Sequence, residues 1–178
     1  KPLEWNSPVA SGQIKSSLLL AGLTGHARIV VTEPLESRDH TERLFNAVGA
    51  TVIGQEIDTG WRVEMPHPPD EIGPLDFTVP GDISSAAFVL TLAALGGAGK
   101  ELTIESVGLN RTRTAFLDVL SRMGVDIEVH DRTPEGFIEP RGDLVVRPRD
   151  LRATSVGAAE IPSLIDEIPL VAVLGACA

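Results

Sequence analysis

Cysteine, tyrosine and the larger aromatic residues are nearly absent from this sequence. Its 178 residues include one cysteine, Cys177, and no tyrosine. A single cysteine excludes an internal disulfide and a cysteine-based zinc site, and it fits a reducing compartment. With only two Trp and five Phe, the core must be built from aliphatic side chains. We therefore expect a cytoplasmic protein with an aliphatic core.

Basic residues are also in the minority. Fifteen Lys and Arg stand against 25 Asp and Glu, which gives a formal charge of −10. Such a chain has no general attraction for nucleic acid or for an anionic membrane, so an anionic substrate would need a locally basic pocket. Asp and Glu interrupt every apolar run before it reaches membrane-spanning length. The opening KPLEWNSPVASG has no initiator Met and no apolar targeting segment, which suggests a fragment.

Two stretches of the sequence repeat one pattern. SSLLLAGLTGHARIVVTEP and FVLTLAALGGAGKELTIESVG each read as an apolar helix, a glycine break and a strand. HTERLFNAVGATVIGQEI and RTAFLDVLSRMGVDIEVH then each read as a helix, a glycine stop at Gly49 or Gly124, and a strand. Both units are therefore expected to run helix, strand, helix, glycine, strand, strand. This order predicts an α/β fold with mixed sheets.

The remaining local signals fill in this architecture. The turn DTG should join the strands TVIGQEI and WRVEM as a hairpin, and the four prolines of 65–74 predict a loop between the units. The helices 14–23 and 85–95 are apolar on most faces, so we expect them to be buried. The final run LVAVLGACA looks like the opening helix of a third unit.

The first candidate for chemistry is SPVASGQIKSS. Ser11, Gly12 and Gln13 precede or open a helix, where backbone N–H groups, a hydroxyl and an amide suit a phosphate or carboxylate, and Lys15 would add charge. The alternative is that Ser11 is only the N-cap of the helix.

The loop EPLESRDHTERL is the second candidate. Arg38 lies where the loop meets a helix that Asp39 could cap, and a guanidinium there can bind phosphate in a bidentate manner. The alternative is a surface salt bridge from Arg38 to Glu36 or Glu42.

Two further stretches carry weaker signals. In VPGDISSAAF, Asp82 or Ser84 is expected to cap a helix. In LNRTRTAF, Arg111 and Arg113 could hold an anion, although exposure to solvent is the simpler expectation.

The segment PSLIDEIPLVAV places two carboxylates before an apolar run. Ser163 and Asp166 fit a capping box, which is the structural alternative. Because proline is tolerated only in the first helical turn, Pro169 requires a helix that begins just before it. Asp166 and Glu167 should therefore lie at or just outside the helix N-terminus, where a carboxylate can act as a proton acceptor.

These five stretches, in this order, resemble the 5-enolpyruvylshikimate-3-phosphate synthase family, and most closely its glyphosate-tolerant bacterial type. The resemblance implies two lobes built from repeated βαβαββ units, with helices inside, an inside-out α/β barrel that is incomplete in this chain. Residues 1–78 would be the latter part of the first lobe, and 79–178 the beginning of the second.

The resemblance also implies roles for individual residues. Ser11 and Gln13 match positions that bind shikimate 3-phosphate, and Gly12 stands where Ala or Ser is usual. Arg38 matches an arginine that faces the same substrate. Asp166 matches the proton acceptor for the attacking 5-hydroxyl, which adds to phosphoenolpyruvate before phosphate leaves. No metal or organic cofactor is implied.

Two other readings remain open at the level of sequence. One is the sister enzyme, UDP-N-acetylglucosamine enolpyruvyl transferase, although its reactive loop cysteine has no match in the corresponding region. The other is a non-catalytic α/β binding module, because two substrate-binding motifs of the family are missing. We expect the chain alone to be inactive, and the parent enzyme to be monomeric and to bind neither nucleic acid nor membrane.

Overall fold

The computed structural model describes residues 2–97 and 99–178. The chain divides into two compact units, Lys1–Phe77 and Thr78–Ala178, which are considered separately below. No helix in these described ranges is long and apolar enough to cross a membrane.

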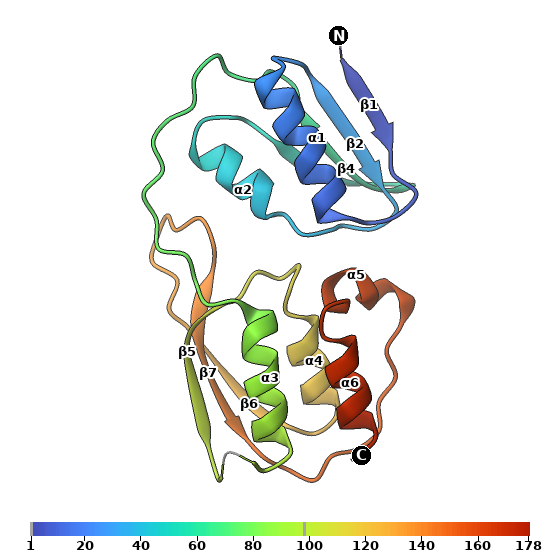
Figure 1. Ribbon diagram of the computed structural model, residues 1–178, viewed down its shortest axis with the longest axis vertical. Helices are drawn as coiled ribbons and strands as arrows, with labels where there is room; N and C mark the ends of the chain where they lie inside the picture. Colours follow the sequence, from blue (N-terminus) through green and yellow to red (C-terminus); the bar gives the residue numbers. More distant parts are fainter. Residues whose placement is uncertain (1, 98) are drawn as a thin grey trace. The chain divides into compact units, whose positions relative to one another are not determined.

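The first unit is a four-stranded mixed sheet with two helices on one face (Figure 1). Its sheet order is β1-β2-β4-β3; β1 is parallel to β2, and the other neighbours are antiparallel. The elements are β1 (Leu3–Asn6), α1 (Gly12–Thr24), β2 (Ile29–Glu33), α2 (His40–Ala47), β3 (Ile53–Ile57) and β4 (Gly60–Met65).

The core of this unit forms where α1 and α2 cover β2 and β4. Alternate residues of β2, Ile29 and Val31, point into it, and a Cβ built on Gly22 of α1 would lie only 2.1 Å from Cγ1 of Ile29. The missing side chain at Gly22 therefore lets α1 approach the strand closely. The buried members are Leu19, Ile29, Val31, Phe45, Ala50, Val52, Val63 and Met65.

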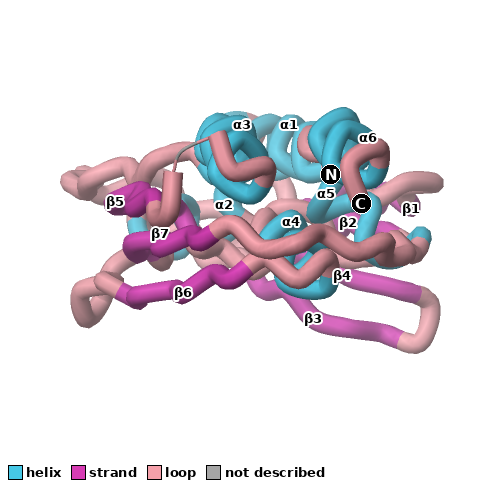
Figure 2. Tube along the Cα trace, turned by 90° about the horizontal axis from the view of Figure 1, so that it is seen from below, coloured by secondary structure: helices cyan, strands magenta, loops and turns pink. Residues whose placement is uncertain are grey.

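The second unit is a three-stranded antiparallel sheet covered by helices. Its strand order is β5-β7-β6, and an isolated parallel bridge joins Gly81 to Val107. In Figure 2, α3 lies over β5 and β7, with α6 beside it. The elements are α3 (Ile83–Ala94), β5 (Leu102–Gly108), α4 (Ala115–Arg122), β6 (Asp126–Asp131), β7 (Arg141–Arg147), the 3-10 helix η1 (Ala158–Glu160), α5 (Ile161–Leu164) and α6 (Ile168–Gly175).

The predicted repeat is confirmed. The order α1, β2, α2, β3, β4 is repeated as α3, β5, α4, β6, β7, and a glycine follows the second helix each time. Gly49 and Gly124 have φ values of 92° and 94°, a region that other residues rarely adopt. The hairpin and the loop between the units also form where they were expected, with β4 extending to Met65.

One expectation about the fold held in part, and another was wrong. The first sheet is mixed, whereas the named strands of the second are all antiparallel, and a parallel pairing is present there as the bridge between Gly81 and Val107. The helices α1 and α3 are not buried on most faces: Leu20 is 50% exposed and Phe88 is 65% exposed. Each helix buries only the side toward its own sheet and a neighbouring helix, α2 for α1 and α6 for α3.

Candidate active site

Ser11, Gly12 and Gln13 lie at the amino end of α1. Ser11 has extended backbone angles, and its hydroxyl accepts a hydrogen bond from the Ile14 N–H at 3.4 Å. The predicted N-cap is therefore present. Gly12 and Gln13 form the first turn, where the N–H groups of a helix favour a bound anion.

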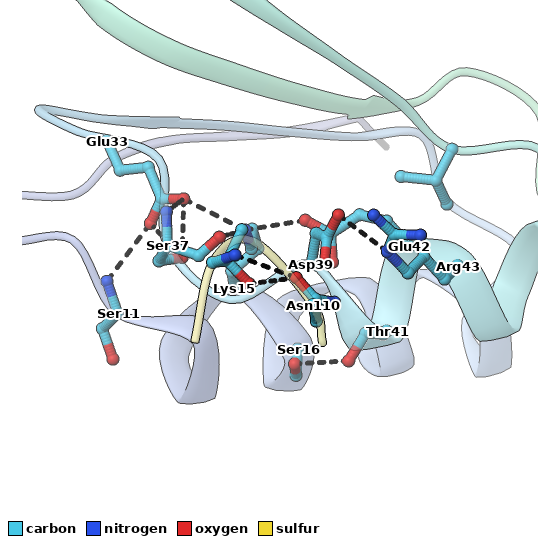
Figure 3. Close-up of polar contacts among 12 residues, drawn as sticks. Ser11, Lys15, Ser16, Glu33, Ser37, Asp39, Thr41, Glu42, Arg43 and Asn110 are labelled. Atoms are coloured by element: carbon cyan, nitrogen blue, oxygen red, sulfur yellow. Dashed lines mark hydrogen bonds and ion pairs between the residues drawn. The ribbon is translucent and has the colours of Figure 1, made fainter. Parts of the chain in front are cut away.

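The structure brings Arg38 to this same helix end. A Cβ built on Gly12 would lie 3.1 Å from Cβ of Arg38, so the loop between β2 and α2 packs directly against the first turn of α1. A cavity of about 210 Å³ opens there, and its lining is Gly12, Gln13, Ser16, Arg38, His40 and Thr41. Two of the lining residues, Ser16 and Thr41, share a hydrogen bond of 2.5 Å between their hydroxyls, which links α1 to α2 (Figure 3).

Lys15 does not add charge to this site, which corrects the expectation from sequence. Its side chain is fully buried, and its Nζ lies 3.1 Å from Glu33 Oε1 and 2.7 Å from Glu42 Oε1. It also donates to the carbonyl of Ser37 at 3.3 Å. Two carboxylates thus compensate the charge of Lys15 inside the unit. Arg38, not Lys15, lines the cavity.

Burial shifts the pKa of one member of this ionic cluster, Glu42. The burial of Glu42 raises the pKa of its carboxyl above the ordinary value, and Lys15 only partly offsets this effect. The cluster therefore contains one lysine and two carboxyl groups, and protonation of Glu42 is easier than for an ordinary glutamate.

A second group of polar side chains lies in the other unit, around the amino end of α3. Asp82 is the N-cap of α3 and accepts hydrogen bonds from the N–H groups of Ser84 and Ser85. Burial pushes the pKa of Asp82 upward, but these hydrogen bonds, that of the Ser85 hydroxyl and the charge of Arg113 outweigh it and leave the pKa below its ordinary value. The predicted cap is confirmed.

Arg113 belongs to this second group, and its expected exposure was wrong. Its side chain is only 14% exposed. It donates to the Ser84 hydroxyl at 2.6 Å and to Asp82 Oδ1 at 3.3 Å. The NRTR pattern showed two cations before a helix, but nothing in the local sequence showed that a distant capping segment would cover one of them.

Asp166 and Glu167 immediately precede α6, which begins at Ile168 with proline in its first turn. The helix start predicted from Pro169 is confirmed. The capping box is not formed, because Ser163 lies inside α5 and its buried hydroxyl has no hydrogen-bond partner in the described chain.

The two neighbouring carboxylates have different surroundings. Glu167 is 1% exposed and accepts a hydrogen bond from the Ser84 hydroxyl. The Asp166 side chain is 47% exposed, and its Oδ2 lies 3.8 Å from the Arg113 guanidinium. Asp166 is therefore open to a reactant, whereas Glu167 fixes the segment to α3.

Together these features define a class of protein: a repeated α/β fold with an arginine-lined cavity at one helix start and a separate exposed carboxylate. Among the described residues, no group of three His, Cys, Asp or Glu side chains could hold a metal ion. The model of one family, EPSP synthase (3-phosphoshikimate 1-carboxyvinyltransferase), matches residues 1–178. The chain belongs to this family.

Individual relatives agree with this assignment. The chain is 49% identical over 173 residues to the 3-phosphoshikimate 1-carboxyvinyltransferase of Synechococcus sp. (strain RCC307), an alignment that covers 97% of this chain and 39% of that protein. It is 47% identical over 178 residues to the enzyme of the same name from Salinibacter ruber, covering 100% and 40%. A solved structure, EPSP synthase from Acinetobacter baumannii, superposes with a TM-score of 0.80 at 35% identity and covers 100% of this chain and 39% of that one. The chain thus spans about two fifths of the length of these relatives.

Proposed function

We propose that this chain supplies the central part of an enzyme that transfers the enolpyruvyl group of phosphoenolpyruvate to the 5-hydroxyl of shikimate 3-phosphate. The observation that carries the proposal is the match of the EPSP synthase family along the whole chain. Two relatives that align with nearly all of the chain are named for the same reaction. No feature of the described residues favours the UDP-N-acetylglucosamine enzyme or a non-catalytic module.

The cavity at the start of α1 is proposed to bind shikimate 3-phosphate. Ser11 and Gln13 would contribute the helix start, and Arg38 would contribute a cation to the phosphate. The support is geometric, since Gly12, Gln13 and Arg38 line one cavity although the arginine follows Gln13 by 25 positions in the chain. Gly12 allows this proximity, because a side chain there would press on Arg38.

Asp166 is proposed to be the proton acceptor. The 5-hydroxyl oxygen would form a bond to the enol carbon of phosphoenolpyruvate while its proton passes to the carboxylate, and the double bond would open as its methylene carbon takes up a proton. In a later step the phosphate would leave as that carbon loses a proton and the double bond forms again. The exposure of the Asp166 side chain and the position of Asp166 just before α6 support this role. The reaction would need bound cations around both anions rather than a cofactor.

The two units are proposed to belong to different lobes, 1–78 to the first and 79–178 to the second. The exposed apolar residues of α1 and α3 support this, because helices of the family pack inside lobes of three units. Monomeric state and cytoplasmic location remain predictions.

One substitution in the full-length protein tests the assignment of Asp166. Asp166→Asn preserves the shape of the side chain but cannot accept a proton. We expect kcat for phosphate release to fall about 10²–10⁴-fold, the usual contribution of a general base, with little change in the melting temperature or in the Kd for shikimate 3-phosphate.

Asp118→Asn is the matched control, since Asp118 lies in the first turn of α4 and is not among the proposed site residues. A full-length protein without any phosphate release would refute the proposed function itself. An Asp166→Asn variant with native turnover would refute only the role of Asp166. The 178-residue chain by itself should show no turnover, because it lacks most of the phosphoenolpyruvate contacts expected for the family.

A further inference from the structure

Glu33 is a buried carboxylate at the end of a core strand. It follows Ile29 and Val31 on the face of β2 that the helices cover, and it is 1% exposed. A carboxylate at such a position is costly unless charges and hydrogen bonds compensate it. The bonds that it makes show which segments it joins.

The Glu33 carboxylate joins two separate segments of the candidate site (Figure 3). Its Oε2 accepts from the Ser11 N–H at 3.2 Å, and its Oε1 accepts from the Ser37 N–H at 3.1 Å. The Ser37 hydroxyl also reaches the two oxygens at 2.7 and 2.9 Å. Ser11 directly precedes Gly12 and Gln13, and Ser37 directly precedes Arg38.

We propose that Glu33 is a positioning residue for substrate binding, whose carboxylate fixes the start of α1 and the Arg38 loop at one spacing. This inference rests on the proposed function, because it takes the cavity between these segments as the site of shikimate 3-phosphate. Glu33 itself does not line the cavity. It acts through the backbone N–H of Ser11 and through both the backbone N–H and the hydroxyl of Ser37.

The charge of Lys15 makes this arrangement possible. Nζ lies 3.1 Å from Glu33 Oε1, so a cation stands beside the buried carboxylate, and both of its oxygens accept hydrogen bonds. A glutamine of the same shape has only one acceptor oxygen. If that oxygen stays with Lys15 and Ser37, the amide group faces the Ser11 N–H, and that hydrogen bond is lost.

The test compares Glu33→Gln with Glu42→Gln in the full-length protein. Both variants remove one carboxylate beside Lys15, but within the described residues the Glu42 oxygens accept no hydrogen bond from an N–H group of either segment. We expect Glu33→Gln to raise the Kd for shikimate 3-phosphate about tenfold, the loss of one charge-assisted hydrogen bond. Glu42→Gln should change this Kd by less than about twofold.

Two further measurements separate positioning from folding. The stoichiometry of calorimetric binding gives the folded fraction, so that the Kd refers to folded molecules. Hydrogen exchange should become faster at the Ser11 amide in Glu33→Gln and stay unchanged there in Glu42→Gln. A role in stability alone would lower the melting temperature and leave the Kd unchanged.

If Glu33→Gln does not fold, Ser37→Ala replaces it, because this variant keeps the carboxylate and Lys15 and removes only the hydroxyl contacts. It should weaken binding about threefold. The inference is overturned if either folded variant binds with native affinity, or if Glu42→Gln weakens binding as much as Glu33→Gln. If the unmodified protein does not bind shikimate 3-phosphate, the proposed function fails rather than the role of Glu33.

Discussion

Replacement of Lys15 by methionine would test how strongly the first unit depends on its buried charges. Methionine has nearly the length of lysine and fits an apolar surrounding. It leaves Glu33 and Glu42 without their cation, and their side chains are 1% and 9% exposed. The substitution therefore changes charge with little change in volume.

The expected loss of stability follows from this burial. Removal of one partner from a buried ion pair costs about 3–5 kcal/mol, because the remaining charge is neither solvated nor paired. Two carboxylates would remain here, but Glu42 can take up a proton, since burial already raises its pKa. We expect a loss of about 3–5 kcal/mol at pH 7 and a smaller one near pH 4.5.

Tryptophan fluorescence makes this measurement specific to the first unit. The sequence has two tryptophans, Trp5 in β1 and Trp61 in β4, and both belong to that unit. Urea unfolding followed by this signal therefore reports on the unit that contains Lys15. Arg28→Met is the control, because it removes a cation from the same sheet whose partners Glu4 and Glu64 are more exposed, and it should move the midpoint little.

The double variant Lys15→Met/Glu42→Gln gives the refuting comparison. It removes one of the two unpaired carboxylates, so it should be more stable than Lys15→Met alone. A Lys15→Met protein within about 1 kcal/mol of the native one at pH 7 would show that the cluster is hydrated, and the reasoning from burial would be wrong.

Three further predictions concern single side chains. Arg38→Ala in the full-length protein should raise the Kd for shikimate 3-phosphate about tenfold or more by calorimetry, since a charge-assisted contact contributes about 1.5–3 kcal/mol; an unchanged Kd would assign Arg38 to a surface salt bridge. Gly49→Ala should lower the stability measured by tryptophan fluorescence by about 1 kcal/mol because of the positive φ at Gly49, and Gly49→Asn should lower it less. Glu42→Gln should gain stability relative to the native chain as the pH rises above about 4.5. The raised pKa of Glu42 stabilises the native chain below the unfolded pKa, and this stability is lost as the pH rises through the folded pKa, whereas glutamine does not titrate. Parallel pH profiles of the two proteins would contradict this.

Most of the element order could be predicted from the sequence, because local signals define it. Three of these signals depend on nearby residues only: the glycines that end helices at Gly49 and Gly124, the DTG turn, and the alternating pattern of the strands. The start of α6 followed from Pro169 alone. The extent to which α1 and α3 are buried could not be predicted in this way. An apolar helix composition does not say how many faces of the helix the rest of its unit can cover.

The candidate site was predictable only in part, for a physical reason. Ser11 and Asp82 cap their helices as the local pattern indicates. The pairings of Lys15 with Glu33, and of Arg113 with Ser84, join residues 18 and 29 positions apart. Such pairs depend on how strands and helices pack, and the sequence carried no local mark of them. A lysine within an otherwise apolar helix was the one available signal, since a buried lysine requires a partner.

The adjacent carboxylates Asp166 and Glu167 are explained by a division of roles. Pro169 fixes the start of α6, so the backbone of both residues is set by the helix that follows. Glu167 is then buried and bound by Ser84 of α3, which ties the turn to the core, while Asp166 remains half exposed with Arg113 at 3.8 Å. Because Ser84 is bonded to both Glu167 and Arg113, the same hydroxyl anchors the turn and the cation beside Asp166. The exposed carboxylate is therefore held from two sides without being covered, as its proposed role of proton acceptor requires.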